Sequence, residues 1–301
     1  MTAETGPYTD AMPELPEVEA LVNDLRGRLA DRAIVRVDVA AFSALKTFDP
    51  PLSALTGTLV EDVARHGKFL DITASGLHLV IHLSRAGWLR WRDTVPAAPP
   101  RPSNKSPLAA RIVLDDDSGM DITEAGTQKR LAIYVVRDVQ EVPGVARLGP
   151  DPLADEFTIG VLEQILRDAG RAQLKGVLRS QSTIAGIGNA YSDELLHAAR
   201  MSPFKPAVTV AESPEELRTL YDAIRGVLSD AVARSSGLAA AELKSEKKSN
   251  LAVHGRAGLP CPVCGDTVRE VSFADSSLQY CPTCQTGGKP LADRRLSRLL
   301  K

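Results

Sequence analysis

Long hydrophobic runs and aromatic residues are scarce in this chain of 301 residues. No apolar stretch approaches the ~20 residues that a membrane-spanning helix needs, so we expect no membrane association. Residues 1–11 lack the basic start and apolar centre of a secretory signal, which predicts a cytoplasmic protein. Hydrophobic residues make up 44% and charged residues 25%, which excludes a disordered chain and is typical of a globular one.

Neither sign of charge dominates, since 36 basic residues oppose 38 acidic ones. Affinity for phosphate backbones comes largely from Lys and Arg, so the overall balance argues mildly against a nucleic-acid partner. The end of the chain differs, because five basic residues between Lys289 and Lys301 accompany a single acid, Asp293. Such a tail is usually solvated surface, so it does not indicate nucleic-acid binding by itself.

The length exceeds that of one hydrophobic core, so we expect two domains and a small third unit. Residues 12–29 carry apolar side chains at helical spacing, and residues 34–93 and 110–139 read as short strands joined by turns. The proline-rich stretch 94–107 between them predicts an exposed loop. Further helices are expected at 158–169, 174–200 and 214–233, and a flexible polar loop at 235–257.

All four cysteines fall into two C-x2-C pairs, separated by sixteen residues: Cys261, Cys264, Cys281 and Cys284. Four thiolates at this spacing can surround one tetrahedral ion and form a closed structural zinc site. Two disulfides are the alternative, but the cytoplasm keeps thiols reduced. The pattern therefore predicts one structural zinc ion and no catalytic role for the metal.

The segment IAGIGNAYSDE at residues 184–194 combines a glycine-rich turn with the start of a helix. Free backbone N–H groups at such a place can bind a phosphate. On spacing alone the turn more often only connects two helices. Three further segments accompany it: MPELPEVE from Met12, RHGKFL from Arg65, and HGRAGLPCPVCG followed by YCPTCQ near the end.

These four ordered motifs resemble the Fpg/Nei family of bacterial DNA glycosylases, the formamidopyrimidine-DNA glycosylases and endonuclease VIII-like enzymes, of which this chain looks like a divergent member. The resemblance implies an α+β fold: an N-terminal β-sandwich with a leading helix, and a C-terminal helix–two-turn–helix domain with a zinc-binding β-hairpin. The implied boundaries are 1–11 (extension or misassigned start), 12–142 (catalytic sandwich), 143–156 (linker), 157–250 (helix–two-turn–helix), 251–287 (zinc hairpin) and 288–301 (basic tail).

The resemblance also implies the chemistry. The family removes damaged bases with the amine of an N-terminal proline, which corresponds here to Pro13. An α-amine has a pKa near ~8 and is therefore more often neutral than a lysine, and a helix N-terminus lowers its pKa further. By similarity, Glu14 transfers protons at the sugar, and Lys68, Lys175 and Asn189 bind phosphates around the extruded nucleotide. Lys68 is counted with Pro13 and Glu14 as a residue of the catalytic site. The implied partner is damaged duplex DNA, bound by a monomer associated with the nucleoid.

The sequence departs from the family pattern at three places. Eleven residues precede Met12, and within a chain Pro13 is an amide that cannot attack. Either translation starts at Met12, which we expect, or the leading residues are removed, or Pro13 is not the nucleophile. Ser276 stands where the family's hairpin arginine binds phosphate, and one neutral hydrogen bond replaces a guanidinium fork. Arg85 replaces a methionine among the residues that fill the gap left by the extruded base. Lys129 and Leu131 stand at the expected arginine and phenylalanine.

Arg256, just before the first cysteine pair, is a further candidate DNA contact. The sequence therefore predicts a DNA glycosylase with abasic-site lyase activity, acting on oxidised pyrimidines, abasic sites or an unusual lesion rather than on purine lesions. A non-catalytic DNA-damage or DNA-structure binding protein on the same scaffold is the alternative. A zinc-ribbon protein of transcription or RNA metabolism is a third, favoured only if the first 150 residues were unrelated to the family.

Overall fold

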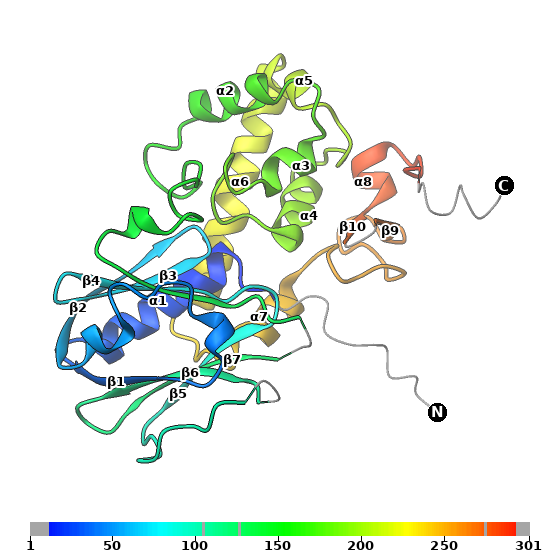
Figure 1. Cartoon of the computed structure of the whole chain (residues 1–301). Coiled ribbons are helices and arrows are strands. Elements are labelled where there is room, and N and C mark those ends of the chain that lie inside the picture. Colours follow the sequence, from blue (N-terminus) through cyan, green and yellow to red (C-terminus); the bar gives the residue numbers. More distant parts are fainter. Residues whose placement is uncertain (1–11, 104–105, 126–127, 274–275, 293–301) are drawn as a thin grey trace, which may run out of the picture. The chain divides into compact units, whose positions relative to one another are not determined.

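The computed structural model describes residues 12–103, 106–125, 128–273 and 276–292. The proposed extension 1–11 and most of the basic tail lie outside these residues. The chain forms two compact units (Figure 1). One combines residues 1–147 with the short segment 235–244, and the other combines residues 148–234 with residues 245–301.

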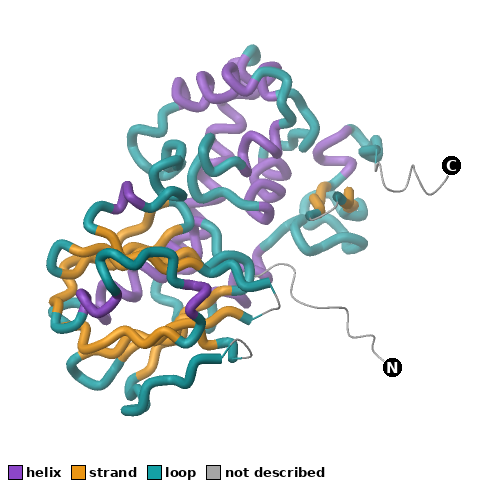
Figure 2. Tube along the Cα trace, viewed as in Figure 1, coloured by secondary structure: helices purple, strands orange, loops and turns teal. Residues whose placement is uncertain are grey.

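The first unit is an antiparallel β-structure of eight strands in the order β5-β7-β6-β1-β2-β3-β4-β8. Their bounds are β1 Ala33–Val39, β2 Thr58–His66, β3 Phe69–Ala74, β4 Leu77–His82, β5 Gly87–Arg92, β6 Leu108–Leu114, β7 Gly119–Glu124 and β8 Ala132–Val136. Short 3-10 turns lie at Phe42–Ala44, Leu52–Leu55 and Val139–Glu141. Only two residue pairs join β1 to β2, so the sheet folds there into two layers, as Figure 2 shows.

Helix α1, Leu15–Leu29, contributes Val18, Leu21, Val22 and Leu25 to the core of this unit. These residues recur at spacings of three and four, so one face of the helix is buried against strands β2 and β3. Pro16 lies in the first turn, where its missing N–H costs no hydrogen bond. The predicted leading helix and β-sandwich are thus confirmed, and the proline-rich stretch joins β5 to β6 without a described helix or strand.

The second unit is mainly helical. Its helices are α2 Ile159–Ala169, α3 Leu174–Arg179, α4 Asn189–Ala198, α5 Ala207–Ala211, α6 Pro214–Ser235, α7 Leu243–Asn250 and α8 Pro282–Thr286. Strands β9, Arg269–Ser272, and β10, Ser277–Tyr280, form the predicted hairpin. Among the described helices, none is long and apolar enough to span a bilayer.

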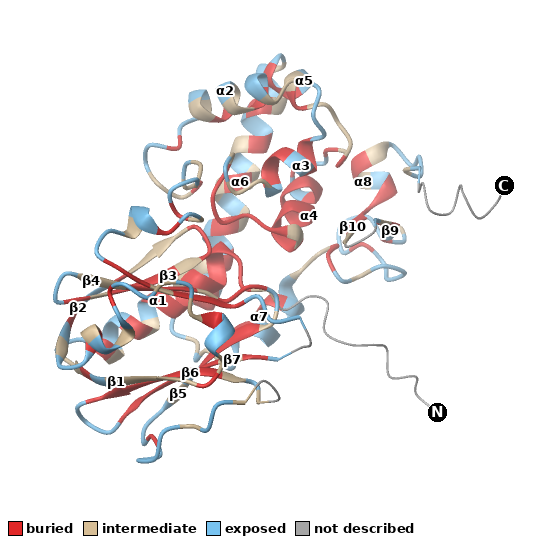
Figure 3. Ribbon diagram, viewed as in Figure 1, coloured by how far each residue is buried: buried red, intermediate tan, exposed pale blue. Residues whose placement is uncertain are grey.

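The expectation of a flexible loop at 235–257 was wrong. Helix α7 forms within it, and Leu243, although surrounded by polar sequence, is fully buried in the core of the first unit. The Trp88 indole also donates to the Ala240 carbonyl at 2.7 Å. The polar composition concealed this anchoring, because one leucine and one tryptophan far away in sequence supply it. In Figure 3 buried residues concentrate between the sandwich layers and along α3 and α4.

Candidate active site and zinc centre

The start of α1 places Pro13 and Glu14 in a buried position. Glu14 is only 2% exposed, and its backbone N–H donates to the Glu17 carboxylate at 2.8 Å. Glu14 and Glu17 form a reciprocal capping box, which fixes the direction in which the chain enters the helix. The residue pair that the resemblance assigns to catalysis is therefore held rigidly at a helix N-terminus.

The turn between β2 and β3 carries Lys68 and is tied to α1. The Arg65 guanidinium donates to Glu19 on α1 at 2.6 Å and to the Gly67 carbonyl at 3.2 Å. Gly67 has a positive φ of 57°, which a glycine adopts without steric cost. Lys68 is 8% exposed. Arg65 thus links α1, which Glu14 directly precedes, to the turn that carries Lys68.

His82, at the end of β4, lies across the sheet from this turn. It pairs with Phe69 on the neighbouring strand β3, and the two rings contact each other in a tilted arrangement, with centroids 4.6 Å apart and planes at 42°. Burial and the nearby positive charge of Lys68 lower the pKa of His82 to about 4. The imidazole is therefore neutral near pH ~7, and it adds no second cation beside Lys68.

Arg85 is exposed on the tight turn that joins β4 to β5. The Gly87 N–H donates to the Leu83 carbonyl at 2.9 Å, and a Cβ on Gly87 would lie 2.0 Å from that oxygen. Ser84 has a φ of 56°, a left-handed conformation unusual for a residue other than glycine. The turn therefore holds Arg85 at the edge of the sandwich at some cost in backbone strain.

Lys129 is exposed on the neighbouring loop, and its ammonium donates to the Glu124 carbonyl at 2.5 Å. Leu131, matched from the sequence to a family phenylalanine that fills the gap in DNA, is 1% exposed and belongs to the sandwich core. Its backbone N–H donates to the buried Glu124 carboxylate at 2.9 Å, just before β8 begins. The side chain is thus not presented at the surface.

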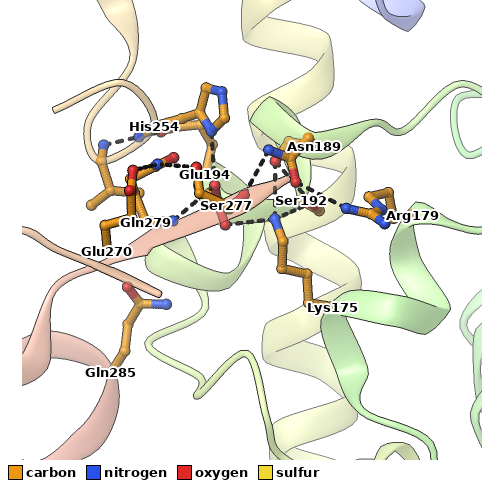
Figure 4. A network of polar contacts seen from close by, with 12 residues as sticks. Lys175, Arg179, Asn189, Ser192, Glu194, His254, Glu270, Ser277, Gln279 and Gln285 are labelled. Atoms are coloured by element: carbon orange, nitrogen blue, oxygen red, sulfur yellow. Dashed lines mark hydrogen bonds and ion pairs between the residues drawn. The ribbon is translucent and has the colours of Figure 1, made fainter. Parts of the chain in front are cut away.

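Lys175, on α3, lies in the second unit and is 6% exposed. Its ammonium donates to the Asn189 carbonyl at 3.1 Å, to Ser192 Oγ at 2.8 Å and to Asp193 Oδ1 at 2.6 Å (Figure 4). An ammonium has three N–H donors, and these three acceptors match them. Lys175 therefore holds the first turn of α4, and contact with a phosphate would replace one of these bonds.

Asn189 is the first residue of α4, and its side-chain amide both donates and accepts a hydrogen bond. Its Nδ2 donates to the Ser277 carbonyl of the hairpin at 2.9 Å, and Arg179 donates to its Oδ1 at 3.2 Å. The structure thus brings Lys175 and Asn189 together, as expected for two residues with a common ligand. Their described contacts join α3, α4 and β10.

Asp193 and Glu194 form the centre of this network and were not singled out in the sequence. Asp193 accepts from Lys175, from the His254 ring at 2.8 Å and from the Gln279 backbone at 3.2 Å. Glu194 accepts the backbone N–H groups of residues 252, 253 and 254. Burial raises the pKa of Glu194, and these donors oppose that shift. Two adjacent acids beside Leu195 and Leu196 in one helix were the available signal, because carboxylates that a helix buries need partners.

The four cysteines come together around one point. Their Sγ atoms all lie within 4.8 Å of one another, with Cys264 and Cys281 at 3.3 Å and Cys261 and Cys284 at 3.9 Å. Zn–S bonds of about 2.3 Å give a tetrahedron with S–S edges of about 3.8 Å, so the cluster fits zinc. Burial raises the pKa of the Cys281 thiol to about 11, so a bound cation is what stabilises its thiolate.

His197, on α4, supports this centre from outside, with its Nε2 3.3 Å from the Cys261 sulfur. Burial and Arg200 lower the pKa of His197, which favours a neutral ring. A ring N–H directed at a ligand sulfur is a common outer contact of zinc sites. The cluster holds one structural zinc ion, as the spacing predicts.

The two remaining candidates lie beside the zinc centre. Arg256 donates through Nη2 to the Pro260 carbonyl at 3.3 Å, and its Nε is buried without a hydrogen-bond partner among the described residues. Ser276 directly precedes β10, and its carbonyl accepts from the Phe273 N–H at 2.8 Å. Two hairpin residues, 274 and 275, lie outside the described chain. Neither contact concerns a ligand, so both roles in DNA binding stay predictions.

Comparison with known families identifies the architecture. Residues 12–131 match the formamidopyrimidine-DNA glycosylase N-terminal domain, residues 148–242 match the H2TH domain of the same enzymes, and residues 258–287 match the zinc finger found in FPG and IleRS. All three matches follow the order of the elements described above.

Individual proteins agree with these matches. An uncharacterized formamidopyrimidine-DNA glycosylase-like protein of Mycobacterium tuberculosis is 60% identical over 53% of this chain and 98% of its own length. The formamidopyrimidine-DNA glycosylase of Symbiobacterium thermophilum is 36% identical over 94% of this chain and 93% of its own.

A solved complex between Lactococcus lactis Fpg and DNA containing an abasic site superposes with a TM-score of 0.77 at 25% identity. The match covers 91% of this chain and 99% of that one. The three domains in sequence, the full-length relatives and the zinc centre establish that this chain belongs to the formamidopyrimidine-DNA glycosylase family of base-excision-repair enzymes.

Proposed function

We propose that this protein is a DNA glycosylase with abasic-site lyase activity, and that the Pro13 nitrogen is its nucleophile. The arrangement at the start of α1 carries the proposal: the segment of Pro13 and Glu14 is buried, capped by Glu17, and linked through Arg65 to the turn with Lys68. A rigid, partly desolvated amine beside a carboxylate is what covalent catalysis at a sugar carbon needs.

The chemistry begins with a neutral secondary amine at residue 13. Its nitrogen forms a bond to C1′ of the deoxyribose while the bond from C1′ to the damaged base breaks, and the base leaves with a proton. Glu14 protonates the sugar ring oxygen as the ring opens, which leaves an iminium ion on the opened sugar. Loss of a C2′ proton then expels the 3′ phosphate by β-elimination, and δ-elimination removes the 5′ phosphate.

His82 beside Lys68 is neutral, so it does not compete with Lys68 for an anionic partner. We assign to Lys68 the binding of a phosphate next to the extruded nucleotide. Lys175, Asn189, Arg85, Lys129, Arg256 and Ser276 are the remaining proposed DNA contacts. The protein would act as a monomer on DNA in the bacterial cytoplasm, associated with the nucleoid.

Borohydride trapping on abasic-site DNA tests the proposal. A protein whose first residue is Pro13 should form a reduced covalent adduct, whereas a protein that retains residues 1–11 should form none, because the Pro13 nitrogen is then an amide. Pro13→Gly should retain DNA binding and lose most strand nicking. Unchanged nicking in that variant would identify another nucleophile, with Lys68 the first to examine.

A non-catalytic DNA-binding protein is the second candidate. The specific observation in its favour is that Met12 precedes Pro13 in the sequence, so that the Pro13 nitrogen is part of a peptide bond there. Absence of any adduct from both forms of the protein, together with binding to the same DNA, would decide for this candidate and against the enzyme.

A further inference from the structure

The outer face of strands β5, β7 and β6 carries a row of charged side chains. Leu89 on β5 and Ile122 on β7 belong to the core of the first unit, so their neighbours along each strand point away from the core. Arg90 pairs with Asp121, and Asp121 pairs with Arg111 on β6. These three residues therefore lie side by side on the outer face of the sheet.

Asp121 already pairs with two other arginines of this face. Arg111 donates to its two oxygens at 2.6 and 3.1 Å, and Arg92 donates to Oδ2 at 2.5 Å. Asp121 is 2% exposed, and although burial opposes its ionisation, these hydrogen bonds hold its pKa below the ordinary value. The exposed guanidinium of Arg90, directly opposite on β5, forms no hydrogen bond or ion pair with the described residues. Its charge is therefore not neutralised by Asp121.

The segment 235–244 brings a second cation, Lys244, to the same face. Trp88 lies two residues before Arg90 on β5, and the Lys244 ammonium lies 4.4 Å from the centroid of its ring, within the range of a cation–π contact. Leu243, the neighbour of Lys244, is fully buried, so the backbone that carries this lysine is fixed. The Lys244 side chain itself is exposed.

The two cations are close enough to influence one another. Partial burial and the positive charge of Arg90 lower the pKa of Lys244. Within the described part of the chain, no carboxylate pairs with the Lys244 ammonium. Glu242, the one acid of segment 235–244, accepts the Ala239 N–H at 2.9 Å instead. Two like charges that a fold holds together without a counter-ion repel one another, and an anion bound to both relieves this repulsion.

A phosphate diester suits this pair of cations. A guanidinium offers two parallel N–H donors to two phosphate oxygens, and an ammonium adds a compact charge with three donors. Only the turn 83–86 separates the start of β5 from His82, which lies beside Lys68. Arg90 follows about 10 Å further along β5, a distance that about three nucleotides of a DNA strand span.

We propose that Arg90 and Lys244 together bind one backbone phosphate of the DNA, a few nucleotides from the damaged one. The proposal rests on the proposed function, because it takes DNA as the ligand. Phosphate contacts position a protein on DNA and carry no sequence information, so this site adds affinity and orientation but no lesion preference. Segment 235–244 then has two roles, because it completes the core and also supplies Lys244.

The salt dependence of DNA binding tests the proposal. Fluorescence anisotropy measures the affinity for one abasic-site duplex at several salt concentrations. Arg90→Ala and Lys244→Met, which keeps an aliphatic chain over Trp88, should each weaken binding about fivefold to tenfold at about 0.1 M salt. In the double variant the slope of log K against log salt should become less steep by about 0.9, the loss of one phosphate contact. Lys244→Arg keeps the charge and should bind like the wild type.

Arg137→Ala is the matched control. It removes one exposed arginine that follows the end of β8 and pairs with Asp49, so it changes the net charge by the same amount as Arg90→Ala. Affinity and slope should stay close to those of the wild type. An equal effect of Arg137→Ala and Arg90→Ala would mean that net charge alone sets the affinity, and it would overturn the proposal.

Inorganic phosphate alone distinguishes the two sources of a phosphate group. Calorimetric binding of inorganic phosphate that depends on Arg90, together with unchanged DNA affinity in the Arg90→Ala variant, would identify a site for small anions and overturn the assignment to DNA.

Failure of this inference and failure of the proposed function look different. If the wild type forms the borohydride adduct and the double variant binds DNA with unchanged affinity and slope, the inference alone fails. If no adduct forms, but the double variant loses affinity and slope as expected, the proposed function fails and the phosphate site stands.

Discussion

Charged side chains at the edge of the sandwich face solvent, whereas those around α4 are buried against one another. Arg85 and Lys129 are both exposed, and the Lys129 ammonium donates to an uncharged acceptor, the Glu124 carbonyl. In the second unit, Lys175, Asp193 and His254 form a closed set of ion pairs and hydrogen bonds. The first arrangement leaves charge available to a ligand. The second uses charge to fix the position of the zinc hairpin on the helix, so a residue type alone does not tell which role it has.

The sharpest way to break the second arrangement is to remove the metal. Cys264→Ala should release zinc and unfold residues around the hairpin, since structural zinc contributes on the order of 10 kcal/mol to small metal domains. Zinc content by mass spectrometry and DNA binding measure the effect. A Ser277→Ala variant, which keeps the carbonyl that Asn189 contacts, should retain both. Full zinc content in Cys264→Ala would contradict the four-cysteine site.

The buried ion pair comes next. Asp193→Ala leaves the Lys175 ammonium buried without its carboxylate, which should lower the free energy of unfolding by about 3–5 kcal/mol. Asp24→Ala is the matched control, because it removes a more exposed pair with Arg28 and should cost only about 0.5 kcal/mol. Urea denaturation measures both. Equal losses would show that burial does not distinguish the two pairs. A second change, Lys175→Met, should recover part of the larger loss.

Stability at acid pH should depend on His82 in the first unit. The pKa of His82 is about 4 in the folded protein against 6.5 in an unfolded chain, so unfolded chains bind more protons between these values. The contribution of neutral His82 to the free energy of unfolding is therefore complete above pH 6.5, the pKa in the unfolded chain. It is lost as the pH falls toward about 4, the pKa in the folded protein. Between about pH 7 and about pH 4.5 the wild type should lose about 2–3 kcal/mol more than His82→Gln. Identical losses in urea denaturation would refute this.

The smallest expected effect concerns the backbone strain at Ser84, in the turn that carries Arg85. Ser84 has a left-handed backbone, which glycine adopts without steric strain. Ser84→Gly should stabilise the protein by about 0.5–1 kcal/mol, whereas Gly87→Ala should destabilise it through its clash with the Leu83 carbonyl. Thermal unfolding compares the two. A destabilising Ser84→Gly would mean that the Ser84 side chain contributes more than the strain costs.

The parts of this molecule that could be predicted from sequence are those encoded locally. The cysteine pairs need only their spacing, and α1 needs only its apolar periodicity after Pro16. The motif around Asn189 predicted a turn before a helix, and α4 begins there. In each case the residues that define the feature are close neighbours in the chain.

The parts that sequence reasoning missed depend on distant partners. Asp193 meets Lys175 across 18 positions and His254 across 61, and neither separation leaves a periodic trace. Leu131 was matched to a gap-filling residue of the family, but its backbone N–H donates to the Glu124 carboxylate and its side chain lies in the core. Local composition predicts neither outcome. The burial of Leu131 and the pairing of Asp193 with Lys175 and His254 depend on residues that are distant in the sequence.

The segment 235–244 makes the first unit discontinuous in sequence. Leu243 completes its core, and Leu238 and Ala240 pack against that core, although about ninety residues of the other unit intervene. A fragment that ends at Arg147 would thus leave part of the hydrophobic core exposed. It should bind residues 235–244 when these are added as a separate peptide. Cleavage of the connection near residue 147 should leave two pieces that co-purify, so truncated forms of this protein need to include residues 235–244.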